Sequence, residues 1–154
     1  MDKILSLLND LKNKDPVTRN SATHQLWEIW YQEAGETAEK ELQRGVRFIS
    51  DNHLDEAREV FGNLIKQFPA FAEAHNKLAT LLFIEGHYED AVAACKRTLK
   101  INPHHFGAWN GMGMCLYKLA RYEEAIKSFA MAGKIQPYAD INREYIGRCR
   151  GKLN

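Results

Sequence analysis

Two adjacent histidines, His104 and His105, are the residues whose types and spacing come closest to a reactive or metal-binding site. Imidazole nitrogens bind zinc, but a stable site needs three or four ligands. No cysteine or third histidine lies near this pair in the sequence. We therefore interpret the pair as part of a loop that hydrogen-bonds to the next helix, and we predict no metal site.

Three cysteines, Cys95, Cys115 and Cys149, are the other candidates for chemistry. Their number is odd, their spacing is wide, and no CxxC pair occurs, so we expect reduced, buried, small apolar residues in a reducing compartment. The sequence also lacks a glycine-rich phosphate loop, a nucleophile elbow and a paired-histidine zinc motif. These observations predict a protein that is not an enzyme, with no catalytic residue and no cofactor.

Composition and charge restrict the class of protein further. The 154 residues are 45% hydrophobic, which is enough to bury a core, and 21 basic side chains balance 20 acidic ones. This balance disfavours a dedicated nucleic-acid binder. No apolar run reaches the roughly 18 residues of a membrane span, and Met1–Asn13 is amphipathic and unlike a secretory leader. We expect a soluble intracellular protein, in the cytoplasm or an organelle interior, with no membrane or nucleic-acid partner.

Repetition is what organises the chain. Prolines recur every 34 residues at Pro69, Pro103 and Pro137, and alanines recur at the same interval at Ala57, Ala91 and Ala125. A fixed period of this length is typical of stacked pairs of helices. Within the unit 72–105, Gly86 suits the end of a first helix, and Pro103 stops a second one.

Small residues are predicted where the two helices of a unit cross. The alanines of the second helix should face Gly45, Ala79 and Gly113 of the first helix. Close approach of the two backbones would explain glycine inside a helix, where it costs about 1 kcal/mol relative to alanine.

The repeated residues together resemble the tetratricopeptide repeat (TPR) family. The third unit matches the family pattern best, with Trp109, Met112, Gly113, Leu116, Tyr122, Ala125, Phe129, Ala132 and Pro137. The resemblance implies an all-α fold, an α-solenoid that winds as a right-handed superhelix. It divides the chain into three TPR units, 38–71, 72–105 and 106–139, followed by a capping helix over 140–154.

Residues 1–37 fall outside the repeat but also show helical periodicity. We predict a helical hairpin packed on the repeats, in which Pro16 begins the second helix, with a spacing similar to a HEAT-type repeat. It should cap the exposed face of the first unit. Trp30 is assigned to the hairpin core. Trp27 is either buried against the first repeat as well or an anchor for a partner.

The TPR resemblance implies that the first helices line a concave groove that holds a peptide segment of a partner. The predicted groove residues are Asn76, Lys77, Thr80, Phe83, Asn110, Met114, Tyr117, Lys118, Tyr145 and Arg148. Asn76 and Asn110 occupy the same step of successive units, so their amides should form a ladder facing a peptide backbone. Gly107 and Gly111 lie on the same face, and either a ligand backbone or the Tyr145 ring should approach them closely.

These residues predict a non-catalytic adaptor or assembly factor, a scaffold that binds a protein segment in the groove. The alternative is a self-associating structural module, a homodimer joined through Ile146, Cys149 and Leu153 of the last helix. RNA binding through that basic helix is a third possibility.

One known mode of binding within the family is disfavoured. The clamp that holds the EEVD tails of heat-shock chaperones needs lysine, asparagine and arginine side chains at five groove positions. In this chain those positions hold Leu42, Val46, Lys77, Gly107 and Gly111. Chaperone tails are therefore not expected as partners.

Overall fold

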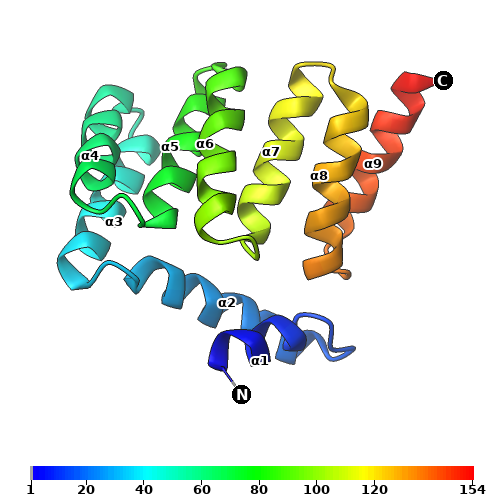
Figure 1. Cartoon of the computed structure of the whole chain (residues 1–154), viewed down its shortest axis with the longest axis horizontal. Coiled ribbons are helices and arrows are strands. Elements are labelled where there is room, and N and C mark those ends of the chain that lie inside the picture. Colours follow the sequence, from blue (N-terminus) through cyan, green and yellow to red (C-terminus); the bar gives the residue numbers. More distant parts are fainter. Residues whose placement is uncertain (1) are drawn as a thin grey trace.

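The computed structural model describes residues 2–154, and every regular element in that range is an α-helix (Figure 1). The helices are α1 (Lys3–Asp10), α2 (Pro16–Gln32), α3 (Glu36–Ser50), α4 (Leu54–Gln67), α5 (Ala72–Ile84), α6 (Tyr88–Ile101), α7 (Phe106–Lys118), α8 (Tyr122–Ile135) and α9 (Asp140–Leu153). Helices α3 to α9 stand side by side in chain order, which confirms the all-α repeat fold (Figure 1).

The turns inside the units repeat with the period of the sequence. Asn52, Gly86 and Ala120 follow α3, α5 and α7, and their φ angles are 59°, 79° and 58°. This left-handed conformation is the one that ends a helix, and glycine adopts it without steric cost. The prediction for Gly86 is confirmed, and the other two positions form the same turn without glycine.

The prolines that close the units also hold the following helix. The side chain of Trp109 donates from Nε1 to the carbonyl oxygen of Pro103 at 2.8 Å. One unit earlier, Nε2 of His75 lies 2.9 Å from the carbonyl oxygen of Pro69. A ring nitrogen at the same place explains why histidine can replace tryptophan at this step of the repeat.

Glycines in the first helices accommodate phenyl rings. A Cβ atom at Gly45 would overlap the ring of Phe61, and one at Gly113 would lie 2.8 Å from the ring of Phe129. The prediction that the alanines of the second helix impose these glycines is therefore wrong. In the second unit the ring is replaced by Cys95, and the first helix can carry Ala79.

The N-terminal hairpin is formed by α1 and α2. Pro16 begins α2 as predicted, and Asp15 caps it by accepting hydrogen bonds from the backbone N–H groups of Val17 and Thr18 at 3.3 and 3.2 Å. The hairpin lies across one end of the row of repeat helices (Figure 1). It does not simply cap the first unit.

The hairpin core reaches the third unit. Leu8, Leu11, Leu26 and Trp30 pack in one cluster with Phe106 of α7, and Ile135 of α8 borders it. Trp30 is 1% exposed, and its ring stacks on His105 with 4.6 Å between centroids. The prediction of a buried Trp30 is correct, but its partners belong to the third unit and not to the first. Trp27 is partly buried against the same His105 and Phe106 rings.

A buried polar pair lies beneath Trp30. His105 accepts a hydrogen bond at Nδ1 from the backbone N–H of Ala108 at 3.0 Å, so its proton is on Nε2 and is donated to Oε1 of Glu73. Both side chains are fully buried, and Oε2 of Glu73 has no hydrogen-bond partner. His105 therefore bonds to the next helix as predicted and caps α7, and it is not available to bind a metal.

Candidate functional site

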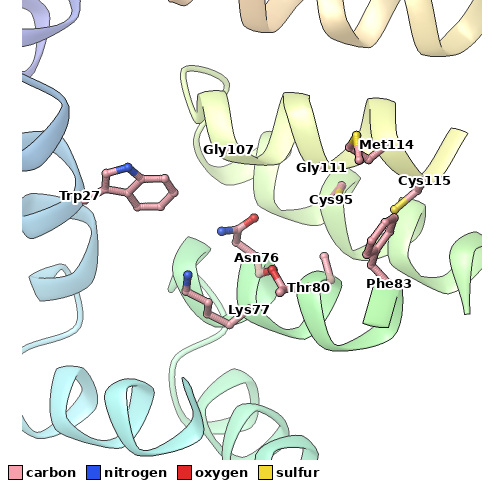
Figure 2. Close-up of a pocket in the computed structure, with 11 residues that line it drawn as sticks. Trp27, Asn76, Lys77, Thr80, Phe83, Cys95, Gly107, Gly111, Met114 and Cys115 are labelled. Carbon is pink, nitrogen blue, oxygen red and sulfur yellow. The ribbon is translucent and has the colours of Figure 1, made fainter. Parts of the chain in front are cut away.

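A pocket of about 250 Å³ opens between α5 and α7 on the predicted groove face (Figure 2). Trp27 of α2 stands at one end, the α5 side chains form one wall, and α7 forms the other (Figure 2). The lining residues are Trp27, Asn76, Lys77, Ala79, Thr80, Phe83, Cys95, Gly107, Gly111, Met114 and Cys115. We call this space the α5–α7 pocket. The hairpin supplies only Trp27, at one end, and leaves the pocket open.

Half of the predicted groove residues line this pocket, namely Asn76, Lys77, Thr80, Phe83 and Met114. Asn76 is 7% exposed, and its amide lies 3.5 Å from Oε1 of Glu73. Thr80 is exposed and donates to the backbone oxygen of Asn76 at 3.2 Å. The α5 wall is therefore polar near Trp27 and apolar near Phe83.

Lys77 is the only charged residue that lines the pocket. Its Nζ atom lies 5.5 Å from the ring centroid of Trp27 and 5.3 Å from that of Tyr31, close enough for a cation–π interaction with each ring. Within residues 2–154 no carboxylate lies within 4.0 Å of its ammonium group. The aromatic rings fix this cation at the mouth of the pocket without neutralising it.

Asn110 does not face the pocket. Its amide nitrogen donates to Oδ1 of Asn142 on α9 at 3.0 Å. The predicted ladder of two amides facing a peptide backbone is therefore wrong, because one amide is paired internally and Asn76 is almost fully buried. The repeat register could not reveal this pairing, since Asn142 replaces the alanine found at the matching step in the earlier units, Ala74 and Ala108.

The remaining predicted residues gather between α7 and α9. Tyr117 and Tyr145 pack edge to face with 5.4 Å between centroids. Arg148 lies 4.8 Å above the ring of Tyr145 and forms an ion pair with Glu144 at 2.5 Å. Lys118 is exposed at the end of α7. These four residues do not line the α5–α7 pocket.

The pocket lies at one of three equivalent contacts between successive units. We define the second junction as the contact of α5 and α6 with α7, and the third junction as the contact of α7 and α8 with α9. At the third junction the rings of Phe129 and Tyr145 stack, with 5.2 Å between centroids and 21° between planes. The residues 34 positions earlier are Cys95 and Gly111, and both line the pocket.

Two glycines on α7 face this region for different reasons. A Cβ atom at Gly107 would lie 2.8 Å from the ring of Trp27, so glycine is required there. At Gly111 the nearest atom to a Cβ would be the sulfur of Cys95, at an ordinary 3.8 Å. The predicted close approach of Tyr145 is wrong, because Trp27 occupies that place at Gly107 and nothing crowds Gly111.

Cys95 and Cys115 line the pocket but were not among the predicted groove residues, and Trp27, which the sequence left open as a buried residue or a partner anchor, lines it as well. The hydrogen bond to Cys115, together with burial, raises the pKa of the Cys95 thiol, so Cys95 stays protonated and contributes an apolar wall. A signal for Cys95 was present, because cysteine stands where the other units carry phenylalanine. Trp27 gave no comparable signal, since its helix lies outside the repeat.

A second, shallower pocket adjoins the first. It has a volume of about 360 Å³ and shares Trp27 and Lys77 with the α5–α7 pocket. Its other lining residues come from α2 and α3, namely His24, Glu28, Tyr31, Gln32, Glu39 and Gln43. The two hollows lie on either side of the Trp27–Lys77 contact and together run from α3 to α7.

Residues 2–154 contain neither a candidate metal site nor a candidate membrane span. No cluster of three or more histidine, cysteine, aspartate or glutamate side chains with metal-binding geometry occurs there. In the same range, no helix combines the length and the hydropathy that a bilayer span requires.

Known proteins resemble this chain along most of its length. A TPR repeat-containing protein of Rhizobium etli is 25% identical over 153 residues, which is 99% of this chain and 74% of that protein. Among solved structures, the Arabidopsis OM64 TPR domain is 21% identical with a TM-score of 0.71, covering 79% of this chain and 98% of that domain.

A second similar structure contains a bound peptide. The first TPR of Spaghetti, in complex with an HSP90 peptide, is 17% identical with a TM-score of 0.72, covering 73% of this chain and 90% of that one. At these identities the structural matches show a shared fold. Residues 50–132 also match the family described as anaphase-promoting complex, cyclosome, subunit 3, a TPR-type family. The chain therefore belongs to the tetratricopeptide repeat family.

Proposed function

We propose that this protein is a non-catalytic interaction module that binds a peptide segment of a partner across the α5–α7 pocket. The observation that carries the proposal is the pocket itself. It opens on the first helices of the repeats and is lined by five of the residues that the repeat register assigned to a groove. Pockets that combine apolar walls with a few polar groups are typical binding sites.

The solved TPR domain of Spaghetti binds a chaperone-derived peptide, which supports a peptide as the kind of ligand. The chemistry of the ligand differs in our proposal. Of the five clamp positions, only Lys77 offers a cation, and Gly107 and Gly111 offer no side chain at all. We therefore expect no binding of an EEVD-ending peptide through a carboxylate clamp.

The test is a selection of peptides from a random display library on the folded protein. Selected peptides are then measured by fluorescence polarisation against Gly111→Tyr, which places a ring in the pocket. The matched control is Gly147→Tyr, because a Cβ atom at Gly147 meets nothing within 4 Å and its helix position is exposed. Binding that survives in the control and is lost in Gly111→Tyr supports the proposal. Binding that is equal in both variants refutes it.

The self-association alternative loses one of its three predicted contact residues. Cys149 is completely buried, whereas Leu153 is 48% exposed and Ile146 is partly buried. Light scattering at tens of micromolar decides this point. A dimer that dissociates in Leu153→Asp would favour self-association. A monomer would argue against self-association, and peptide binding would remain as the proposed function.

A further inference from the structure

The α5–α7 pocket corresponds to the place of a missing pair of aromatic rings. At the third junction Phe129 and Tyr145 stack between α7, α8 and α9. At the second junction the equivalent residues are Cys95 and Gly111, whose side chains are a short thiol and a single hydrogen atom. Both of the truncated positions line the pocket. The repeat therefore retains the helix arrangement at the second junction but lacks the two rings that fill the third.

Among residues 2–154, no side chain fills this space, which remains open as the α5–α7 pocket. Trp27 closes one end, where Gly107 makes room for it, and Phe83 borders the other end (Figure 2). Gly111 has room for a larger residue, and glycine weakens a helix relative to alanine. Packing within the chain gives no reason for glycine at this position. Glycine would be required at this position if the space receives a group from another molecule.

The walls suit an aromatic ring. Met114 and the two thiols provide polarisable sulfur, and Phe83 offers a ring for an offset or edge-to-face contact. At the third junction the Tyr145 ring has Phe129 stacked on it and Tyr117 edge-on at 5.4 Å, and Tyr117 is the residue 34 positions after Phe83. An aromatic ring from a partner would lie beside Gly111, the position that corresponds to Tyr145.

The charge around the pocket favours an anionic neighbour for that ring. Neither aspartate nor glutamate lines the α5–α7 pocket, and Lys77 stands at its mouth without an ion pair. A carboxylate next to the inserted ring would meet this ammonium group, which Trp27 and Tyr31 already hold in position. Thr80 is exposed one turn along α5 and adds a polar contact.

We propose that the α5–α7 pocket receives an aromatic side chain of a partner peptide, with an aspartate or glutamate of the same peptide bound to Lys77. This inference rests on the proposed function and names its ligand chemistry. The inserted ring completes the packing that Phe129 and Tyr145 complete at the third junction. An aromatic residue flanked by an acidic one is thus the sequence feature that the site selects.

The composition of the selected peptides tests the inference. Peptides that require Gly111 should share one aromatic position with an acidic residue nearby. Replacing that aromatic residue by alanine should weaken binding by about tenfold or more, as for aromatic anchors at other interfaces. Lys77→Met should weaken binding about threefold to tenfold and reduce its dependence on salt, whereas Lys66→Met, an exposed lysine on α4, should not.

A second variant fills the pocket in another way. The double change Ala79→Gly with Cys95→Phe restores the glycine–phenylalanine pair found at Gly45 with Phe61 and at Gly113 with Phe129. We expect wild-type helix content by circular dichroism and loss of binding of the aromatic peptides. Retained binding in this folded variant would overturn the inference, because the phenyl ring introduced at position 95 and the aromatic ring of the peptide cannot occupy the same space.

Failure of the inference and failure of the proposed function give different results. Selected peptides that require Gly111 but contain no aromatic residue would overturn the aromatic anchor while peptide binding stands. The anchor is likewise refuted if the aromatic-to-alanine peptide binds as tightly as its parent. A selection that gives no peptide dependent on Gly111 would instead refute the proposed function itself.

Discussion

The second and third junctions of the repeat array are built from equivalent positions and packed in different ways. The third is closed by two stacked rings, Phe129 and Tyr145. The second replaces both rings with small groups, opens a pocket, and buries the pair Glu73 and His105 where the third carries Gly107 and Ala139. The comparison teaches that a repeat fold tolerates an unfilled junction when other contacts hold its helices, here the tryptophans of α2.

The largest effect should come from the buried pair that only the second junction has. His105→Ala would leave the Glu73 carboxylate buried without its hydrogen-bond donor and would remove the cap of α7, at a cost of about 3–5 kcal/mol in the free energy of unfolding. Urea denaturation measures this loss. Glu73→Gln, which keeps an acceptor for His105, should cost less, and equal losses in the two variants would contradict the assigned geometry.

Removing the ring of the third junction should matter more than removing its counterpart in the second. Phe129→Ala deletes a fully buried ring and should cost about 3–5 kcal/mol, whereas Cys95→Ala should cost about 1 kcal/mol. Thermal and urea unfolding of the two variants give the comparison directly. Similar losses would mean that the second junction is packed as tightly as the third.

Two glycines on the same helix should respond to alanine with opposite signs. Gly113→Ala forces a methyl group against Phe129 and should destabilise the protein by about 1–3 kcal/mol. Gly111→Ala makes only an ordinary 3.8 Å contact with the sulfur of Cys95 and should stabilise α7 by up to about 1 kcal/mol through helix propensity. A destabilising Gly111→Ala would show that this position is more crowded than its neighbours indicate.

The smallest effect concerns charge near the buried pair. Burial, followed by repulsion from Glu73, raises the pKa of Glu33 above its usual value of 4.5 in the folded protein. Ionised Glu33 is therefore less favourable folded than unfolded, and this cost is absent below the unfolded pKa and grows as pH rises through the folded one. Glu33→Gln should raise the melting temperature at pH 7 and leave it unchanged near pH 4. Because part of the Glu33 side chain still reaches solvent, the gain should stay below about 1 kcal/mol.

Much of the fold could be predicted because the repeat makes each unit a template for the next. The turn at Gly86 and the closing prolines follow from that register, and so does the groove face of α5. The placement of α2 could not be predicted in this way, since Trp27 and Trp30 have no counterpart in the units. Their rings fit against His105 and Phe106 only because α2 runs across the helix ends, a tertiary arrangement that local periodicity does not encode.

The repeat register also predicted part of the site. Helical spacing places Asn76 and Thr80 on one face, but it cannot tell which amide will find an internal partner, as Asn110 does in Asn142. The pocket forms because the second junction lacks the two rings that the third junction carries. Cys95 stands where the first and third units carry Phe61 and Phe129, so the smaller side chain indicates the cavity, whereas the residues that the units share do not.

The position of the hairpin also affects the order in which the protein can assemble during translation. Most repeat arrays can add units one after another, since each unit touches only its neighbours. Here α1 and α2 pack on Phe106 and Ile135, which are synthesised later, so both helices must wait while about a hundred further residues are made. At about 5–20 residues per second, their apolar faces stay uncovered for roughly 5–20 s, an interval in which a chaperone could bind them.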